Sequence, residues 1–235
     1  MSMRAVILAG GRGTRLAPYT TVLPKPLMPL GDMPILELLL RQLHKAGVRH
    51  ATLAVGHLSS LIMAYFGDGG QFGMQIEYSI EEEPLGTAGP LRLVNGLDGT
   101  FMVMNGDLLT DLDFNGMVEA HRRERAAATI GLYERDVCID LGVIQTDERG
   151  RVAEYIEKPV YHYQVSMGMY VFEPRALEHV PAGRRFDLPD LIRALVAGGE
   201  PVHTYKHQGY WLDIGRPDDY QRAQDDFEML RSRIL

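Results

Sequence analysis

The chain has 235 residues, of which 46% are hydrophobic and 23% charged, a length and composition typical of one globular α/β domain. Its formal net charge of −7 argues against non-specific binding to nucleic acid or to an anionic membrane, so an anionic substrate would have to be held by local basic residues. No signal peptide and no apolar stretch of membrane-spanning length are evident, which predicts a cytoplasmic protein. The single cysteine, Cys138, cannot form an internal disulfide and is expected to be buried as a small hydrophobic residue.

The first predicted strand, residues 4–9, runs directly into a loop that contains three glycines, two arginines and a threonine. Glycine lets a backbone come close to a ligand and turn its N–H groups inward, and arginine presents fork-shaped donors that suit phosphate oxygens. Lys25 follows between two prolines, where the backbone is stiff and extended. Walker spacing is absent, and Leu16 replaces the third glycine of a dinucleotide fingerprint. The pattern predicts a different kind of polyphosphate site, made by Gly10, Gly11, Arg12, Gly13, Thr14, Arg15 and Lys25.

Strands and helices then alternate, joined by short turns. After a proline-rich loop up to Pro34, we expect helices at 35–47, 58–66 and 88–94 and strands at 48–55, 74–80 and 100–104. This alternation favours a parallel sheet with helices on both faces, and ligands of such sheets bind at the carboxyl ends of the strands. The glycine-rich loop and the segment Asn105-Gly106-Asp107 both follow strands, so they are predicted to meet at that edge.

The second half of the chain has more strands and fewer helices. We expect strands at 126–133, 141–146, 152–156 and 165–172, a hairpin turn at 147–150, and amphipathic helices at 188–196 and 218–230. We predict a single domain over residues 1–235, with residues 1–113 and 114–235 as its two halves. Nothing after Gly215 resembles a hexapeptide β-helix, so no C-terminal β-helix is expected.

Two aspartates follow apolar runs. Asp107 ends Met102-Val103-Met104-Asn105-Gly106-Asp107, and Asp213 ends Tyr210-Trp211-Leu212-Asp213. A carboxylate at such a point either caps the next turn or holds a metal ion, and the residues alone leave both interpretations open. Mg²⁺ in nucleotide sites is held by one or two carboxylates together with phosphates and water.

The stretch Leu8-Ala9-Gly10-Gly11-Arg12-Gly13-Thr14-Arg15-Leu16, followed by Pro24-Lys25-Pro26-Leu27, resembles the signature of the sugar nucleotidyltransferases. The resemblance implies an α/β fold with a Rossmann-like mixed sheet and helices on both faces, the nucleotide-diphospho-sugar transferase fold. It also implies an enzyme that joins an NTP to a sugar 1-phosphate by in-line attack on the α-phosphate and releases pyrophosphate. Asp107 and Asp213 would hold Mg²⁺. The implied catalytic residues are Arg15, Lys25, Asp107, Lys158 and Asp213.

Motifs of the second half resemble the sugar-binding segments of this family, so residues 1–113 become the nucleotide-binding half and residues 114–235 the sugar-binding half. Glu157-Lys158-Pro159 matches the element in which the glutamate accepts sugar hydroxyls and the lysine meets the sugar phosphate. The glycine of Asp140-Leu141-Gly142-Val143 would let the sugar approach the backbone. Val165-Ser166-Met167-Gly168 stands where many relatives have Asn-Ala-Gly, and the shorter serine puts the asparagine–sugar contact in doubt. The implied sugar-phosphate-binding residues are Asn105, Gly142, Glu157, Lys158 and Ser166.

The segment Glu81-Glu82-Glu83-Pro84-Leu85-Gly86-Thr87-Ala88-Gly89 resembles the base-recognition loop of mannose-1-phosphate guanylyltransferases. The Glu81 carboxylate can accept the adjacent N1–H and N2–H donors of guanine, whereas the carbonyls of uracil or thymine would repel it. Uridylyl and thymidylyl relatives tend to carry glutamine at this offset. The implied nucleotide-binding residues are Leu8, Ala9, Gly10, Gly11, Gly13, Thr14, Arg15, Lys25, Glu81, Gly86 and Thr87.

These motifs favour GTP and mannose 1-phosphate or manno-heptose 1-phosphate as substrates of a Mg²⁺-dependent enzyme of sugar-nucleotide and polysaccharide biosynthesis, with no nucleic-acid or membrane partner. A dTTP- or UTP-dependent glucose-1-phosphate nucleotidyltransferase is the alternative. Two rivals are a catalytically inactive sugar-nucleotide sensor, which would be free to lose Lys25, and a guanylyltransferase that acts on a molybdopterin cofactor, which does not explain Glu157-Lys158-Pro159. The sequence leaves open the sugar, the pathway and the oligomeric state, a homo-oligomer included.

Overall fold

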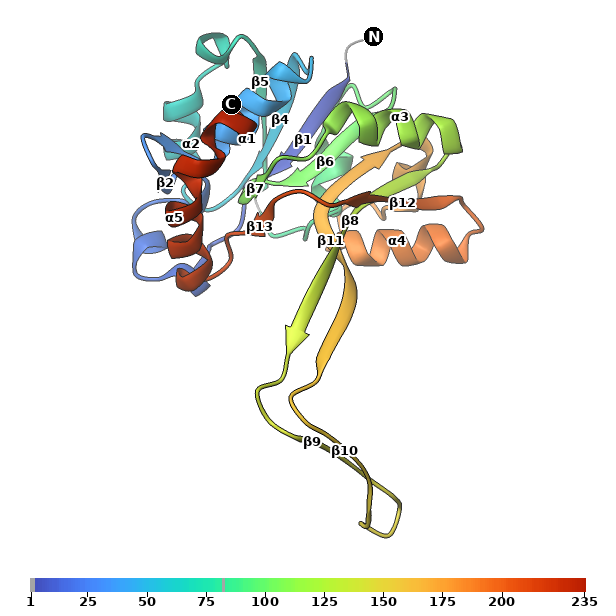
Figure 1. Ribbon diagram of the computed structural model, residues 1–235. Coiled ribbons are helices and arrows are strands. Elements are labelled where there is room, and N and C mark those ends of the chain that lie inside the picture. Colours follow the sequence, from blue (N-terminus) through green and yellow to red (C-terminus); the bar gives the residue numbers. More distant parts are fainter. Residues whose placement is uncertain (1–2, 82) are drawn as a thin grey trace.

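The strand that feeds the glycine-rich loop, β1 (Arg4–Leu8), lies inside a seven-stranded sheet of order β12-β8-β11-β6-β1-β4-β5 (Figure 1). The computed structural model describes residues 3–81 and 83–235. β1 pairs in parallel with β4 and β6, and β11 runs antiparallel to both of its neighbours. The sheet confirms the predicted Rossmann-like mixed α/β class. Its other strands are β4 (His50–Val55), β5 (Gln75–Ile80), β6 (Phe101–Asn105), β8 (Ala128–Cys138), β11 (Val160–Phe172) and β12 (Val202–His207).

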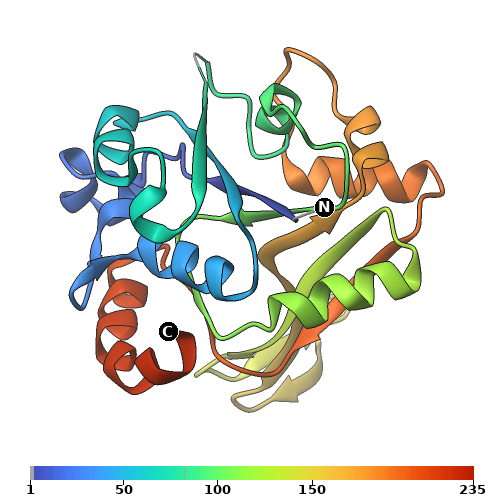
Figure 2. The same cartoon turned by 90° about the horizontal axis from the view of Figure 1, so that it is seen from above.

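Helices cover both faces of this sheet because its strands are apolar on both sides. Ile7 and Met104 belong to one core with α1, α2 and α3, whereas Val6 and Val103 belong to a second core with α4. Figure 2 shows α1 and α3 on one side of the sheet and α4 on the other. A third core joins α5 to α1 and to the loop before it. The helices are α1 (Ile35–Lys45), α2 (Ser59–Phe66), α3 (Phe114–Glu124), α4 (Leu188–Ala197) and α5 (Pro217–Ile234).

Short elements connect these layers. The segment expected to be a helix at 88–94 forms the 3₁₀ helix η5 (Gly89–Leu93). The proline-rich loop holds two small strands and three 3₁₀ turns instead of being irregular throughout. The remaining short elements are η1 (Thr14–Leu16), η2 (Tyr19–Thr21), η3 (Lys25–Leu27), β2 (Pro29–Leu30), β3 (Met33–Pro34), η4 (Gly70–Phe72), β7 (Leu108–Thr110), β13 (Trp211–Asp213) and η6 (Pro174–His179).

A long two-stranded arm, residues 134–165, projects from the edge of the body where the parallel strands end (Figure 1). β8 and β11 stay paired beyond the sheet, as far as Cys138 opposite Val160, although β12 reaches only Tyr133 and β6 only Met169. At the far end β9 (Val143–Thr146) and β10 (Val152–Ile156) form the hairpin expected around 147–150. Both strands of the ribbon are longer than the predicted spans 126–133 and 165–172. Cys138 lies on this arm and is exposed, so its predicted burial is wrong.

Four elements of the second half and of the strand connections were not predicted: β7, α3, β12 and β13. β7 and β13 are only three residues long and pair with each other in a separate two-stranded sheet. α3 is preceded by its N-cap Asp113, whose side chain accepts a hydrogen bond from the Gly116 N–H at 3.0 Å. Within residues 3–81 and 83–235, no helix combines the length and the apolarity that crossing a membrane requires.

Candidate functional site

The glycine-rich loop leaves the carboxyl end of β1 between the ends of β4 and β6. The Ala9 N–H donates to the Ala54 carbonyl at 2.8 Å, and the Gly106 N–H donates to the Leu8 carbonyl at 2.9 Å. Farther along, Gly13 has φ +61°, and a Cβ there would lie 2.9 Å from Thr20, so only glycine fits this turn. The loop is therefore anchored to both neighbouring strands where it starts and to η2 at its turn.

Lys25 and Asp107 form an ion pair beside this loop. Lys25 starts η3 between Pro24 and Pro26, and only 8% of it is exposed to solvent. Asp107 follows β6 and accepts a hydrogen bond from the lysine Nζ through Oδ2. A buried ammonium needs such a partner, because desolvation of an unpaired charge is costly.

Asp213 is brought next to Asp107 by the pairing of β13 with β7. Asp213 lies opposite Leu108, and the Ile214 N–H donates to the Asp107 carbonyl at 3.1 Å. Burial raises the pKa of Asp213, the negative charge of Asp107 raises it further, and the positive charges of Lys25 and Arg15 lower it. A Cβ on Gly215 would be 3.4 Å from Arg15 Nη1, so the Arg15 guanidinium lies beside the segment that carries Asp213. Two carboxylates and two cationic side chains therefore form one cluster.

The Asp107–Asp213 pair suits a hard divalent cation. Among the residues that the structure describes, the buried Asp107 Oδ1 has no hydrogen-bond partner, which leaves an anionic oxygen unsatisfied. In the part of the chain that the structure describes, no cluster of three or more histidine, cysteine, aspartate or glutamate residues could hold a metal ion. Two carboxylates are nonetheless the usual protein share of a Mg²⁺ site, in which phosphate and water oxygens complete the coordination.

Glu81 directly follows β5, and each oxygen of its carboxylate lies near a different neighbour. Oε2 accepts the Leu85 N–H at 2.9 Å. Oε1 lies near Gly10, because a Cβ built on that glycine would be 3.3 Å from it. Burial raises the pKa of Glu81, and the hydrogen bond from Leu85 partly offsets this. One oxygen of this carboxylate is therefore turned toward the glycine-rich loop.

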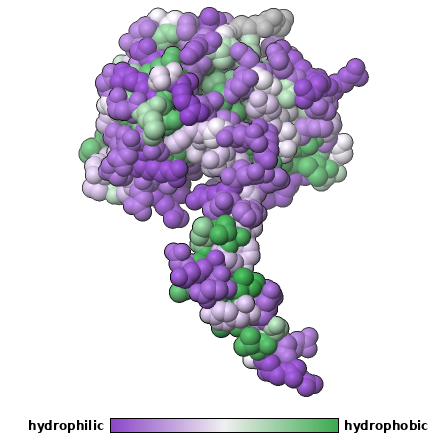
Figure 3. Space-filling model, in the orientation of Figure 1, coloured by the Kyte–Doolittle hydropathy of each residue, from purple (hydrophilic) through white to green (hydrophobic). Residues whose placement is uncertain are grey.

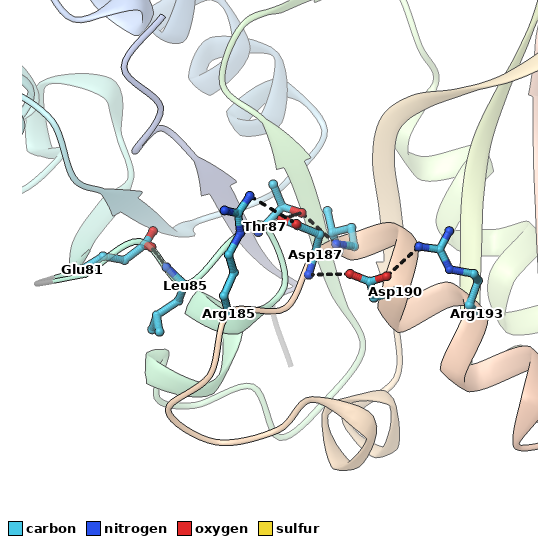
Figure 4. A network of polar contacts seen from close by, with 8 residues as sticks. Glu81, Leu85, Thr87, Arg185, Asp187, Asp190 and Arg193 are labelled. Atoms are coloured by element: carbon cyan, nitrogen blue, oxygen red, sulfur yellow. Dashed lines mark hydrogen bonds and ion pairs between the residues drawn. The ribbon is translucent and has the colours of Figure 1, made fainter.

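The loop that follows Glu81 is fastened to the start of α4 by Asp187, a residue not predicted from the sequence (Figure 4). Asp187 Oδ1 accepts the Thr87 N–H at 3.0 Å, and the Leu188 N–H donates to Thr87 Oγ1 at 2.7 Å. Gly86 has φ +81°, and a Cβ there would lie 2.6 Å from Asp187 Oδ1. Arg185 Nη2 lies 3.6 Å from Asp187 Oδ2. An Asp followed by Leu-Pro-Asp is a helix-start signal, but only the fold shows that this helix meets Thr87.

These segments surround one cavity of about 790 Å³ at the carboxyl edge of the sheet. All the residues predicted to bind nucleotide line it, together with Asn105 and Asp107, and its walls include Gly56, His57, Pro84, Arg185 and Asp187, which were not predicted. The predicted residues on its walls are Leu8, Ala9, Gly10, Gly11, Arg12, Gly13, Thr14, Arg15, Lys25, Glu81, Gly86, Thr87, Asn105 and Asp107.

The other predicted sugar-phosphate residues do not line this cavity. Ser166 lies at the root of the arm, in a bulge of β11 where its Oγ is 3.0 Å from the Tyr170 hydroxyl. Asn105 lies between the cavity and the root of the arm, because a Cβ on Gly168 would lie 2.5 Å from Asn105 Nδ2. Gly142, Glu157 and Lys158 are on the arm itself, and the last two are exposed. The structure thus brings the predicted nucleotide residues together and leaves part of the predicted sugar site apart from them.

The sheet order and the cavity at the strand ends define the chain as a doubly wound α/β protein with a ligand site at the carboxyl edge of its sheet. Its glycine-rich loop, its buried lysine and the nearby arginine suit a site for an anionic ligand. The chain belongs to the nucleotidyl transferase family, which it matches over residues 4–229.

Two relatives carry different activities in their names. The chain is 38% identical to the mannose-1-phosphate guanylyltransferase of Mycobacterium tuberculosis, over 94% of this chain and 64% of the relative. It is 36% identical to the UTP–glucose-1-phosphate uridylyltransferase of Synechocystis sp., over 94% of this chain and 62% of the relative. The chain thus spans less than two thirds of the length of these curated relatives. Among solved structures, HddC from Yersinia pseudotuberculosis, also known complexed with GMP-PN, superposes with a TM-score of 0.74 at 26% identity, over 96% of this chain and 99% of HddC.

Proposed function

We propose that the chain transfers a nucleotidyl group from an NTP to a sugar 1-phosphate and releases pyrophosphate. The observation that carries this proposal is the cluster of Arg15, Lys25, Asp107 and Asp213 beside a cavity that also takes in Glu81. Such a cluster matches the needs of phosphoryl transfer, in which catalysis consists mainly of positioning and charge neutralisation. Membership of the nucleotidyl transferase family supports the same reaction class.

The proposed reaction is an in-line displacement. A sugar-phosphate oxygen forms a bond to the α-phosphorus, the bond from that phosphorus to the β-phosphate oxygen breaks, and pyrophosphate leaves with the electron pair. Asp107 and Asp213 are the residues that would hold Mg²⁺, and the bound ion would neutralise charge on the phosphate oxygens. Arg15 and Lys25 place positive charge against the departing pyrophosphate. The attacking oxygen is already anionic, so the reaction requires no general base.

We propose GTP as the nucleotide, because Glu81 is built to accept hydrogen bonds. Its Oε2 accepts the Leu85 N–H, Oε1 lies near Gly10, and both Glu81 and Gly10 line the cavity. The adjacent N1–H and N2–H donors of guanine suit such a carboxylate, whereas uracil and thymine offer one donor flanked by carbonyls. The Mycobacterium relative is named a guanylyltransferase, which supports GTP, and the Synechocystis relative is named a uridylyltransferase, which keeps UTP as the alternative.

We propose mannose 1-phosphate or manno-heptose 1-phosphate as the acceptor. Asn105, a wall residue of the cavity, lies beside Gly168 at the root of the arm, where Ser166 also lies. The acceptor would extend from Asn105 toward Ser166, with Gly142, Glu157 and Lys158 reaching it from an arm. Lys158 would then orient the attacking phosphate, and Glu157 would accept sugar hydroxyls.

A substrate panel tests the proposal. GTP, ATP, UTP and dTTP are each combined with mannose 1-phosphate, manno-heptose 1-phosphate and glucose 1-phosphate, and pyrophosphate release is measured with Mg²⁺ and with EDTA. We expect turnover only with Mg²⁺ and fastest with GTP and a manno-configured acceptor. Fastest turnover with UTP or dTTP and glucose 1-phosphate would establish the alternative. Binding of a sugar nucleotide without turnover for any pair would replace the enzyme with a sensor.

A further inference from the structure

The stem of the arm has one apolar and one polar face. Directly opposite residues of an antiparallel pair point to the same side of the ribbon, so the register assigns each pair to a face. Tyr161 and Tyr163 share a face, and their ring centroids are 6.4 Å apart. The apolar face carries the pairs Tyr133–Val165, Arg135–Tyr163 and Val137–Tyr161, and the polar face carries Glu134–Gln164 and Asp136–His162 and ends in Cys138–Val160.

The described residues of the same chain leave this apolar face open to solvent. Tyr163 is 53% exposed and Val137 40% exposed, and Ile144 and Tyr155 near the tip are 53% and 61% exposed. Figure 3 shows hydrophobic residues, in green, as separate patches along the arm. An isolated two-stranded hairpin is marginally stable in water, so a ribbon of this length gains stability from a surface that covers it. The arm therefore needs a partner surface.

The arm of one copy does not reach the cavity of that same copy. Six consecutive residue pairs, from Tyr133–Val165 to Cys138–Val160, carry the ribbon outward without a break in register. At 3.3 Å per residue this places Lys158 roughly 20 Å beyond the edge of the sheet. Folding the arm back onto its own cavity would require this ladder to bend sharply or to break. A second copy of the chain can contact the arm in its extended position, without any bend in the ribbon.

We propose that the arm of each copy packs by its apolar face on a second copy of the chain and delivers Glu157 and Lys158 to the sugar-phosphate end of that copy's cavity. A twofold dimer uses the same surfaces on both copies, so two arms complete two sites. The proposal rests on the function proposed above, because it uses the sugar-phosphate role of Lys158.

Charge and area favour a second copy as the occupant. The arm has more acidic than basic side chains, whereas Arg12 and Arg185, both exposed, stand on the wall of the cavity. Tyr19 and Val22, on the loop between Arg15 and Lys25, are 58% and 75% exposed and offer an apolar surface on which the arm of a second copy can pack. The exposed tyrosines of the arm, Tyr155 and Tyr163, add apolar area to this contact, and a twofold dimer buries two such arms.

Complementation between two impaired variants, assayed at a sugar 1-phosphate concentration far below the KM of Lys158→Ala, tests the exchange of arms. Asp107→Asn removes a function of the cavity, and Lys158→Ala removes a function of the arm. The two variants are co-expressed with different affinity tags, and the mixed dimer is isolated through both tags. If arms act in the partner's site, the mixed dimer has one site with an intact cavity and an intact arm, and its turnover of GTP and mannose 1-phosphate should be about half that of the wild-type dimer. A mixed dimer as inactive as either parent would overturn the exchange.

The interface itself is tested by substitutions on the two faces of the arm. Tyr161→Ser with Tyr163→Ser should convert a dimer into a monomer in analytical ultracentrifugation and lower activity. The matched control, His162→Ser with Gln164→Ser on the polar face, should leave the dimer intact. A monomeric, fully active wild-type chain, or equal effects of the two double variants, would refute the interface. Full activity of the Lys158→Ala homodimer would instead refute the sugar-phosphate role proposed for Lys158. The oligomeric state of the two double serine variants would still show whether the apolar face of the arm forms the dimer interface.

Discussion

Asp187 tests how the loop of Leu85, Gly86 and Thr87, called the base loop below, is held in place. Its side chain contacts this loop but is not one of the clustered side chains Arg15, Lys25, Asp107 and Asp213. Its Oδ1 accepts the Thr87 N–H at 3.0 Å, and Thr87 Oγ1 lies 3.4 Å from the same oxygen. Asp187→Ala removes this acceptor and leaves the loop fastened mainly by backbone hydrogen bonds. The loop then has to be ordered when the nucleotide binds, and nucleotide affinity falls.

The size of the loss follows from these contacts. A hydrogen bond to a charged group contributes about 1.5–3 kcal/mol, but the Asp187 side chain is 36% exposed, so solvent screening reduces the figure to about 1–2 kcal/mol. This corresponds to a rise of roughly 5- to 30-fold in KM for the nucleotide, with little change in kcat. Asp187→Asn keeps one carbonyl acceptor and should lie between wild type and the alanine variant.

The assay is steady-state pyrophosphate release at saturating sugar 1-phosphate, together with thermal unfolding of each variant. Asp190→Ala is the matched control, because Asp190 lies in the same helical turn and contacts Arg193 and the Asp187 N–H but not the base loop. Both substitutions should lower stability by about 1 kcal/mol through weaker capping of α4. The reasoning fails if the two alanine variants raise the nucleotide KM equally, since capping alone would then explain the effect.

Three further predictions concern the remaining site residues. Asp107→Asn and Asp213→Asn should each fold yet lose most Mg²⁺-dependent turnover, because an amide is a weaker ligand for a hard cation; turnover within a few-fold of wild type would exclude that residue as a ligand. Glu81→Gln should lower kcat/KM with GTP and raise its relative value with UTP or dTTP; an unchanged preference ratio would show that backbone groups select the base. Lys25→Ala should lower kcat by roughly 10²–10³-fold, whereas Lys158→Ala should mainly raise KM for the sugar 1-phosphate, and rapid-quench kinetics separate the two effects.

The elements that sequence patterns predicted well are those with a strong local signal. Helix α1 has apolar residues at helical spacing and a glycine after its end, and it was found at nearly the expected bounds. The arm was foreseen only in part, because Tyr161, His162 and Tyr163 alternate on a ribbon that no core covers, and burial is what periodicity normally reports. β7 and β13 are too short to show any period.

The candidate site shows the same limit. The glycine-rich loop and Lys25 lie close together in the chain, so their types and spacing indicate one ligand. Asp187 is a hundred residues away from Thr87, and the hydrogen bond between them exists only because the start of α4 packs under the base loop. Glu157 and Lys158 were recognised from their motif, but their position in the fold was not predicted, because the sequence does not show where a long ribbon will place them.

The pairing of β7 with β13 has a consequence for the order in which the protein is made. Asp107 leaves the ribosome early, but the carboxylate beside it arrives only when β13 has been synthesised and α5 has packed against α1. Contacts so distant in sequence form late, because the intervening chain must be ordered first. A partly synthesised or truncated chain can form β1 and its glycine-rich loop, yet it cannot assemble the pair of aspartates. A nascent chain therefore lacks the Asp107–Asp213 pair, and the ion that this pair is proposed to hold, until β13 and α5 have been synthesised.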